Sequence, residues 1–251
     1  KNISKYFAQE TDSYTLICLS LKDKPLAIEL KKCMNIRRIH YVSNTYLILN
    51  DANKYIEGIT SILKKFDDKS NNILILARHL LEHFYDPNRF VSMVSSLGAN
   101  RFVFEVPDAY EQMLICDESV YWSEHKKYFS RYSLGHLLEK NFDEQLILNL
   151  STEKEPVIVA LCKSTGQYNS CINGLNKTKH ETDVACHYSE FYTRYIRKIQ
   201  HLALDFENII LYGAGHNGLT ACMAAGILDT NLSIIDDNIQ LDQKIVSYLG
   251  A

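Results

Sequence analysis

Glycine, proline and tryptophan are scarce in this chain of 251 residues, which holds ten, four and one of them. No glycine occurs before Gly58, so the N-terminal part has no residue that adopts positive φ at low cost. A long apolar run, a signal peptide, a long basic run and a CxxC pair are also missing. These absences argue against a membrane span, a nucleic-acid surface and a zinc knuckle. We expect a cytoplasmic protein.

The seven cysteines are an odd number, which favours reduced thiols over a disulfide framework. Hydrophobic residues make up 46% of the chain, charged residues 23%, and the net charge is −3. These values are typical of a globular protein, and the length allows one large domain with a smaller appendage. We expect a monomer or homodimer that binds a small molecule, without a membrane or nucleic acid as partner.

Apolar runs of strand length alternate with runs of helical spacing in the first two thirds of the chain. The predicted strands are Tyr14–Leu21, Arg38–Ser43, Asn72–Ala77, Arg101–Val106, Gln145–Leu150 and Pro156–Cys162. The predicted helices are Leu26–Met34, Ala52–Phe66, Pro87–Leu97 and Ser133–Lys140, the last with a serine as its cap. Such alternation predicts an α/β domain with a mostly parallel sheet and helices on both faces. We assign it to residues 1–163, with the last two strands as a hairpin that makes the sheet mixed.

The last third of the chain changes character. Ser164–Thr182 is rich in Ser, Asn, Thr, Gly and Lys and predicts a linker, whereas Asp183–Leu204 has the apolar stripe of one long helix. We assign residues 164–206 to this linker and helix. Residues 208–237 then predict a strand, a glycine turn, a helix and a strand. This pattern predicts a partial Rossmann-like βαβ unit over residues 207–251.

A first polar segment, ARHLLEHFYD, follows the third predicted strand, where α/β folds bind ligands. It contains Arg78, His79, Glu82 and His83. On a helix, the HLLEH spacing would place both histidines on one face, but a zinc site needs a third ligand and the HExxH order is absent. We therefore expect no metal, and a solvated strand-to-helix connection is the alternative interpretation.

A second segment, EVPD, ends the fourth predicted strand. Pro107 stops strand pairing there, and Glu105 and Asp108 flank the expected opening of the ligand crevice. An ordinary strand end is the alternative.

A third segment, VYWSEHKKYFSRYSL, surrounds Glu124 and His125 with aromatic residues that include Tyr121 and Tyr128. Histidine is the usual general base near neutral pH, and Glu124 or a tyrosine can orient it or contact the substrate. A histidine between aromatic residues also occurs for structural reasons. The segment alone leaves the catalytic and structural interpretations open.

The order RHLLEH, EVPD and EHKKYFS, followed by YGAGHNG, resembles the sugar C-methyltransferase family. Members of this family use S-adenosylmethionine (SAM) to methylate a carbon of a nucleotide-linked deoxysugar. The resemblance spans roughly Asn71 to Asp237, with little similarity in the linker. It implies a class I methyltransferase-like domain, a C-terminal Rossmann-like domain, SAM as the cofactor and a nucleotide-sugar as the substrate.

The same resemblance implies roles for individual residues. His125 matches the general base, which takes a proton from a sugar hydroxyl or from the carbon beside a keto group to give an enolate. Glu124 would be its neighbour, and Tyr128 would line the sugar pocket. The implied substrate-binding residues are Arg78, His79, Glu82, His83, Glu105 and Tyr121.

Two features depart from the family pattern. The first strand leads into KDKPLAIEL, without the glycine turn that lets the backbone approach SAM, and the second ends in Ser43-Asn44 without an acidic residue for the ribose. The N-terminal cysteine-rich zinc domain of the family is also not visible. Two hypotheses follow: the protein binds SAM in an altered way and is active, or it keeps the fold and binds a nucleotide-sugar or protein partner without methylating.

The C-terminal glycine turn is a second candidate site. Gly213, Gly215 and Gly218 fit a tight turn at a helix N-terminus, which favours phosphate. Asn217 lies in the same turn, and Asp236 ends the next strand, near the position that contacts a ribose hydroxyl in such folds. We expect this turn to hold the diphosphate or nucleoside of a nucleotide-sugar. An NAD-linked enzyme and a packing module without a ligand are the alternatives.

Overall fold

The computed structural model describes residues 2–7, 13–42, 52–64, 72–122, 124–151, 155–164, 179–213, 215–228 and 232–236. The chain divides into two units. The first comprises Lys1–Glu111 and His125–Lys177, and the second comprises Gln112–Glu124 and Thr178–Ala251. These two units group the chain differently from the predicted three parts: the long helix is grouped with the C-terminal strands, and so is the short segment Gln112–Glu124. The predicted linker falls largely outside the described residues.

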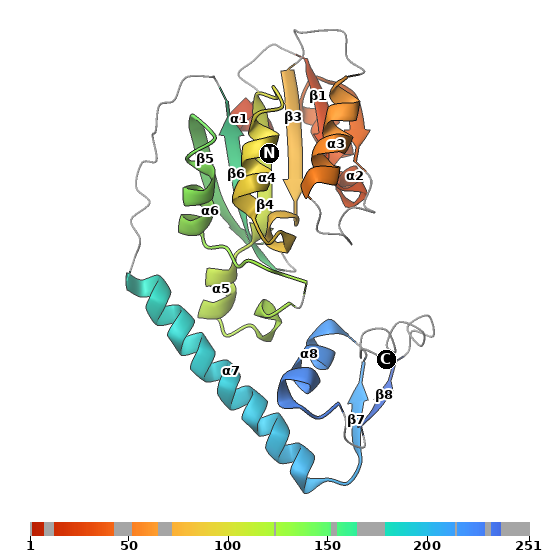
Figure 1. Ribbon diagram of the computed structural model, residues 1–251, viewed down its shortest axis with the longest axis vertical. Helices are drawn as coiled ribbons and strands as arrows, with labels where there is room; N and C mark the ends of the chain where they lie inside the picture. The colour runs from red at the N-terminus through yellow and green to blue at the C-terminus, as the bar shows by residue number, and fades with distance from the viewer. Residues whose placement is uncertain are drawn as a thin grey trace. The chain divides into compact units, whose positions relative to one another are not determined.

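A six-stranded sheet in the order β2-β1-β3-β4-β6-β5 forms the middle of the first unit (Figure 1). Its strands are β1 (Tyr14–Cys18), β2 (Ile36–Tyr41), β3 (Asn72–Arg78), β4 (Arg101–Pro107), β5 (Glu144–Ser151) and β6 (Pro156–Lys163). Strands β1 to β4 are parallel, and β6 runs antiparallel to both β4 and β5. The predicted mixed α/β sheet and its hairpin are confirmed.

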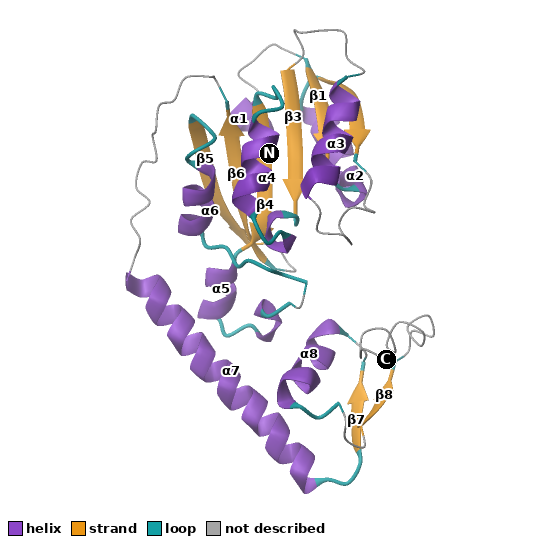
Figure 2. Cartoon of the chain, viewed as in Figure 1, coloured by secondary structure: helices purple, strands orange, loops and turns teal. Residues whose placement is uncertain are grey.

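Helices cover both faces of this sheet (Figure 2). They are α1 (Asn2–Phe7), α2 (Lys24–Cys33), α3 (Ala52–Leu63), α4 (Pro87–Ser95) and α6 (Arg131–Leu138), whereas the short helix α5 (Ala109–Leu114) follows β4 and spans the boundary between the units. One core packs α3, α4 and α6 against the sheet through residues such as Tyr55, Phe90 and Leu134. A second core packs α1 and α2 on the other face through Phe7 and Leu30. Burial of each large apolar side chain stabilises the fold by about 1.5–3 kcal/mol, so the two cores hold the helices against the sheet.

Short-range signals set where the helices begin. Asp86 accepts a hydrogen bond from the backbone N–H of Arg89 at 3.0 Å, with Pro87 in the first turn of α4. A capping box starts α6: Ser130 accepts from the backbone N–H of Ser133, whose hydroxyl accepts from that of Ser130. The predicted start at Ser133 is therefore two residues late, since α6 begins at Arg131 and the serine that caps it is Ser130.

The second unit consists of α7 (Lys179–Asp205), β7 (Ile209–Tyr212), α8 (His216–Ala225) and β8 (Leu232–Ile235). Strands β7 and β8 pair in parallel, so the predicted strand–turn–helix–strand order is confirmed. The segment before His125 packs on α7: the Tyr188 hydroxyl donates to the carbonyl of Asp117 at 2.8 Å. Within the described parts of the chain, no helix combines the length and apolar character needed to cross a membrane.

Candidate functional site

The carboxyl ends of the parallel strands β1, β3 and β4 lie along one edge of the sheet, the edge where open α/β folds bind ligands. Each strand leads into a short polar segment there. Strand β1 runs into the 3₁₀ turn η1 (Leu21–Asp23), β3 into the 3₁₀ turn η3 (Leu81–His83), and β4 into α5. The three sequence-predicted segments therefore share one unit, except for the part of the third that precedes His125.

An ion network occupies part of this edge. Arg78 and Glu105 are register partners on β3 and β4, and Arg78 Nε donates to Glu105 Oε1 at 2.8 Å. The other side of the guanidinium donates to Asp23 Oδ1 at 3.2 Å. Burial raises the pKa of Asp23 to about 6 against the opposing effect of Arg78. Asp23 Oδ2 is buried and has no hydrogen-bond partner among the residues described. Asp23 was not predicted, although its place just before a Pro-containing helix start was a usable signal.

His79 is the second cation of this network. Its Nε2 lies 3.2 Å from Glu105 Oε1, and its Nδ1 lies 3.7 Å from Glu82 Oε1. Burial lowers the pKa of His79, but contacts with the two carboxylates outweigh it and raise the pKa to about 10. The same contacts with His79 and Arg78 hold the pKa of Glu105 below its usual value against the effect of burial. His79 is therefore protonated at neutral pH and does not serve as a base.

The backbone at His79 explains why HLLEH is not a helix. Its φ is +46°, in the left-handed region, and its N–H still donates to the carbonyl of Glu105 at 2.9 Å. The 3₁₀ turn begins only at Leu81. His79 and His83 therefore do not share a helix face, which was the condition of the zinc pattern considered in the sequence.

A second cluster consists of Glu82, His83 and His125. The Glu82 side chain is 2% exposed, and neither of its oxygens has a hydrogen-bond partner in the described parts of the chain. His83 Nε2 lies 4.0 Å from Glu82 Oε1, and the rings of His83 and His125 meet edge-on with their centroids 5.0 Å apart. One ligand-type atom from each of the three residues lies within 4.8 Å of the other two. Glu82 and His83 thus gain a partner from a loop far along the chain.

Backbone hydrogen bonds hold that loop in place. The N–H groups of Lys126 and Lys127 both donate to the carbonyl of Glu82, at 2.7 and 3.0 Å. At its other end the loop bridges to the end of β4, since Ala109 N–H donates to the carbonyl of Phe129 at 2.9 Å. His125 is therefore positioned against η3 by main-chain contacts of the residues that follow it, as a reactive side chain requires.

Other predicted site residues take different places. Tyr128 is near the cluster, with its ring centroid 6.2 Å from that of His125. Glu124 is exposed at the end of the second unit's short segment. Tyr121 lies in that unit and packs against Tyr188 and Tyr192. These contacts give Tyr121 a packing role.

Asp108, from EVPD, is a structural group. Its Oδ1 accepts from the backbone N–H of Glu111 at 3.2 Å, in the first turn of α5, and its Oδ2 accepts from Asn149 at 2.6 Å. Burial raises its pKa although these hydrogen bonds oppose the shift. Both of its oxygens are thus used to hold α5 and β5.

The glycine turn of the second unit has the expected geometry. Gly213 has φ +89° and donates to the carbonyl of Ile235 at 2.7 Å. Gly215 is the N-cap of α8 and offers no side chain to it. A Cβ at this position would have no described atom within 4 Å. A Cβ on Gly218 would lie 3.1 Å from Leu211 Cδ1, so this glycine allows close packing of helix on strand. Asn217 is exposed and Asp236 is half-buried just after β8.

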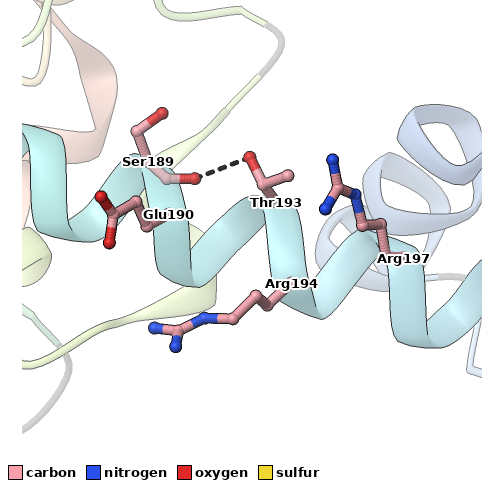
Figure 3. A pocket seen from close by; sticks show the side chains of 5 residues that line it. All are labelled: Ser189, Glu190, Thr193, Arg194 and Arg197. Atoms are coloured by element: carbon pink, nitrogen blue, oxygen red, sulfur yellow. Dashed lines mark hydrogen bonds between the residues drawn. The ribbon is translucent and has the colours of Figure 1, made fainter.

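Two further hollows were not predicted from the sequence. One, of about 370 Å³, lies between α7, α8 and β7 and is lined mainly by apolar side chains such as Ile199, Phe206 and Leu232. The other is a shallow polar hollow on α7. Figure 3 shows that Arg194 and Arg197 extend from α7 in different directions, so they do not converge on one anion.

No protein-family model matches this chain, and neither does any curated protein. Solved structures with a similar arrangement include magnesium protoporphyrin IX methyltransferase from Synechocystis PCC 6803, 11% identical over 65% of this chain and 80% of that one, with a TM-score of 0.41. A small RNA methyltransferase is 16% identical over 67% and 26%, with a TM-score of 0.42. TrmK from M. capricolum is 8% identical over 99% and 95%, with a TM-score of 0.33. Likenesses at this level do not carry function, so the proposals below rest on the residues of this chain.

Proposed function

We propose that the protein is a SAM-dependent C-methyltransferase that acts on a nucleotide-linked sugar or a related small molecule, with His125 as the general base. The observation that carries the proposal is the position of His125. It lies at the ligand-binding edge of the sheet, in a loop fixed by two hydrogen bonds to Glu82, and beside Tyr128. This is a histidine set up to act on a bound molecule.

The residues at the end of β1 fit the amino-acid part of SAM. That part ends in an ammonium and a carboxylate group. The buried, unpaired Oδ2 of Asp23 can accept a hydrogen bond from the ammonium, and the partly exposed Arg78 can attract the carboxylate. These side chains would take the place of the missing glycine turn. When bound, SAM supplies an electrophilic methyl group.

The rest of the chemistry falls to the chain's own residues. His125 accepts a proton from the substrate hydroxyl or from the carbon beside a keto group, a step to which a positioned base contributes 10²–10⁴-fold in typical enzymes. Tyr128 forms a wall of the substrate site, and the hydrogen bonds of Lys126 and Lys127 hold the backbone next to His125. Fixing the base in this way reduces the entropic cost of reaching the reactive geometry.

Calorimetric titration of the full chain with SAM tests this proposal. We expect saturable binding that weakens in Asp23→Asn and is unchanged in Asp205→Asn, an exposed aspartate at the end of α7. Absence of SAM binding at millimolar ligand would reject the methyltransferase. The rival function, a protein of this fold that binds a nucleotide-sugar without methylating, would then be favoured if that ligand alone binds.

We further propose that the Gly213–Gly218 turn binds the diphosphate of a nucleotide. The supporting observation is Gly215, whose N-terminal position on α8 has open space where a side chain would stand. NAD is the competing ligand for the same turn. Titration with a nucleotide-sugar and, separately, with NAD distinguishes the two.

A further inference from the structure

Glu82 presents an unusual electrostatic problem. Its carboxylate is almost fully buried, and neither oxygen has a hydrogen-bond partner among the described residues. Burying an ionised carboxylate without hydrogen bonds or a counterion is costly, and proteins normally offset this by pairing the charge or binding a metal. The Nδ1 of His79 lies 3.7 Å from Glu82 Oε1, an ion pair too long for a hydrogen bond, while its Nε2 lies 3.2 Å from Glu105. Glu82 is therefore paired with one distant cation, accepts no hydrogen bond among the described residues, and faces the two other imidazoles of the site.

We propose that Glu82, His83 and His125 form a binding site for one divalent transition-metal ion, with Zn²⁺ as the best fit. The three residues offer two imidazole nitrogens and a carboxylate oxygen, all within 4.8 Å of one another. Two imidazoles with one carboxylate select zinc or a neighbouring first-row metal over Mg²⁺ and Ca²⁺, which prefer oxygen ligands.

The distances require only a small adjustment. Ligand atoms bound to zinc at 2.0–2.2 Å in tetrahedral geometry stand roughly 3.4 Å apart. Glu82 Oε1 and His83 Nε2 are 4.0 Å apart and no pair of the three ligand atoms exceeds 4.8 Å, so each pair must close by about 1.4 Å or less to reach this spacing. The main chain already holds them together, because Lys126 and Lys127 donate to the carbonyl of Glu82 itself. Three protein ligands leave a fourth position for water, as in catalytic zinc sites.

This inference concerns binding of the ion and does not rest on methyl transfer. It bears on the proposed reaction at one point. With an ion bound, His125 would be one of its ligands, and the ion would supply a water of lowered pKa, about 7 in zinc enzymes, at the same place.

Binding is measured on the full chain, stripped with a chelator and then titrated with Zn²⁺ by calorimetry and with Co²⁺ by absorption spectroscopy. We expect one equivalent of metal and a cobalt spectrum without a thiolate charge-transfer band. Glu82→Gln, His83→Ala and His125→Ala should each weaken the affinity by more than about 100-fold, since even the loss of partners outside the ligand shell costs 10–100-fold.

Glu82→Gln preserves the shape of the buried side chain, so it keeps the test valid if a histidine variant folds poorly. His136→Ala is the matched control, an exposed histidine on α6 in the same unit, and should bind metal normally. Absence of binding would overturn the inference, and so would binding that all three variants retain or that shows cobalt–thiolate absorption. Metal binding without SAM binding would leave the inference standing and reject the proposed function.

Discussion

The chain contains two strand–turn–helix connections that solve the same geometric problem with different residues. After β1, Ser20 accepts from the N–H of Lys22 at 3.1 Å, and Asp23 pairs with Arg78 where α2 begins. After β7, the turn is made by glycines, and α8 starts at Gly215 without any capping side chain. The first turn is held by side chains, whereas no side chain caps α8 among the described residues. A ligand at the first turn would therefore meet charged groups, and a ligand at the second would meet backbone.

This difference predicts where single substitutions act through chemistry and where they act through packing. In the first unit, side chains carry the site, so removing one functional group should change ligand binding or turnover strongly. In the second unit the turn is made by glycines, so the volume of a substituted side chain should affect stability and binding more than its charge.

The largest effect is expected at the side-chain-built edge. His125→Ala should lower turnover by about 10²–10⁴-fold because the proposed proton acceptor is lost. Binding of SAM should change little, since the contacts proposed for it come from Asp23 and Arg78. The comparison is a steady-state rate and a SAM titration on both proteins, with His136→Ala as the control. Undiminished turnover would remove His125 from the mechanism and assign the loop to packing.

The next effect concerns pH. The pKa of Asp23 is about 6 in the folded protein, raised from 3.8, chiefly by burial. Between these values the unfolded chain loses its proton first, so the free energy of unfolding falls as pH rises from about 4 to 6. A shift of about two units corresponds to roughly 3 kcal/mol. Asp23→Asn should flatten this decline. Urea unfolding at a series of pH values measures this fall in the free energy of unfolding, with Asp205→Asn as the control. A fall of unchanged size in Asp23→Asn would show that Asp23 does not cause it.

A smaller effect is expected in the glycine-built turn. In Gly218→Val, the new Cβ lies 3.1 Å from Leu211 Cδ1, and two further methyl groups must fit between α8 and β7. Overpacking of this kind costs about 1–3 kcal/mol. Faster hydrogen exchange of the amides of α8 would report it, and Gly218→Ala should show a smaller change. Equal exchange in the valine variant would mean that helix and strand separate without cost.

The sequence predicted these two turns unequally well. Glycine spacing is a weak signal alone, but together with the apolar runs on either side of it GAGHNG predicted the turn after β7. Periodicity likewise predicted the sheet and its helices, because burial on both faces leaves continuous apolar runs. The cluster at His125 depends on hydrogen bonds from the N–H groups of Lys126 and Lys127 to the carbonyl of Glu82. These residues are distant in sequence, so no local pattern encodes the contact. HLLEH pointed to His79 and His83 as partners, whereas a left-handed residue at the strand end separates them and His125 replaces His79.

The smallest effect is expected for Gly215→Ser, the variant that best separates a packing role of the turn from phosphate binding. Gly215 has φ −65° and ψ 153°, which any residue adopts, and its Cβ position is open. Gly215→Ser should therefore be tolerated and add a capping hydroxyl, raising the free energy of unfolding by a few tenths of a kcal/mol. If the turn binds a diphosphate, the same hydroxyl competes for the N–H groups of α8 and lowers nucleotide affinity. Denaturant unfolding and nucleotide titration of one variant thus separate two roles: greater stability with weaker binding supports the phosphate site, and greater stability with unchanged binding assigns the turn to packing.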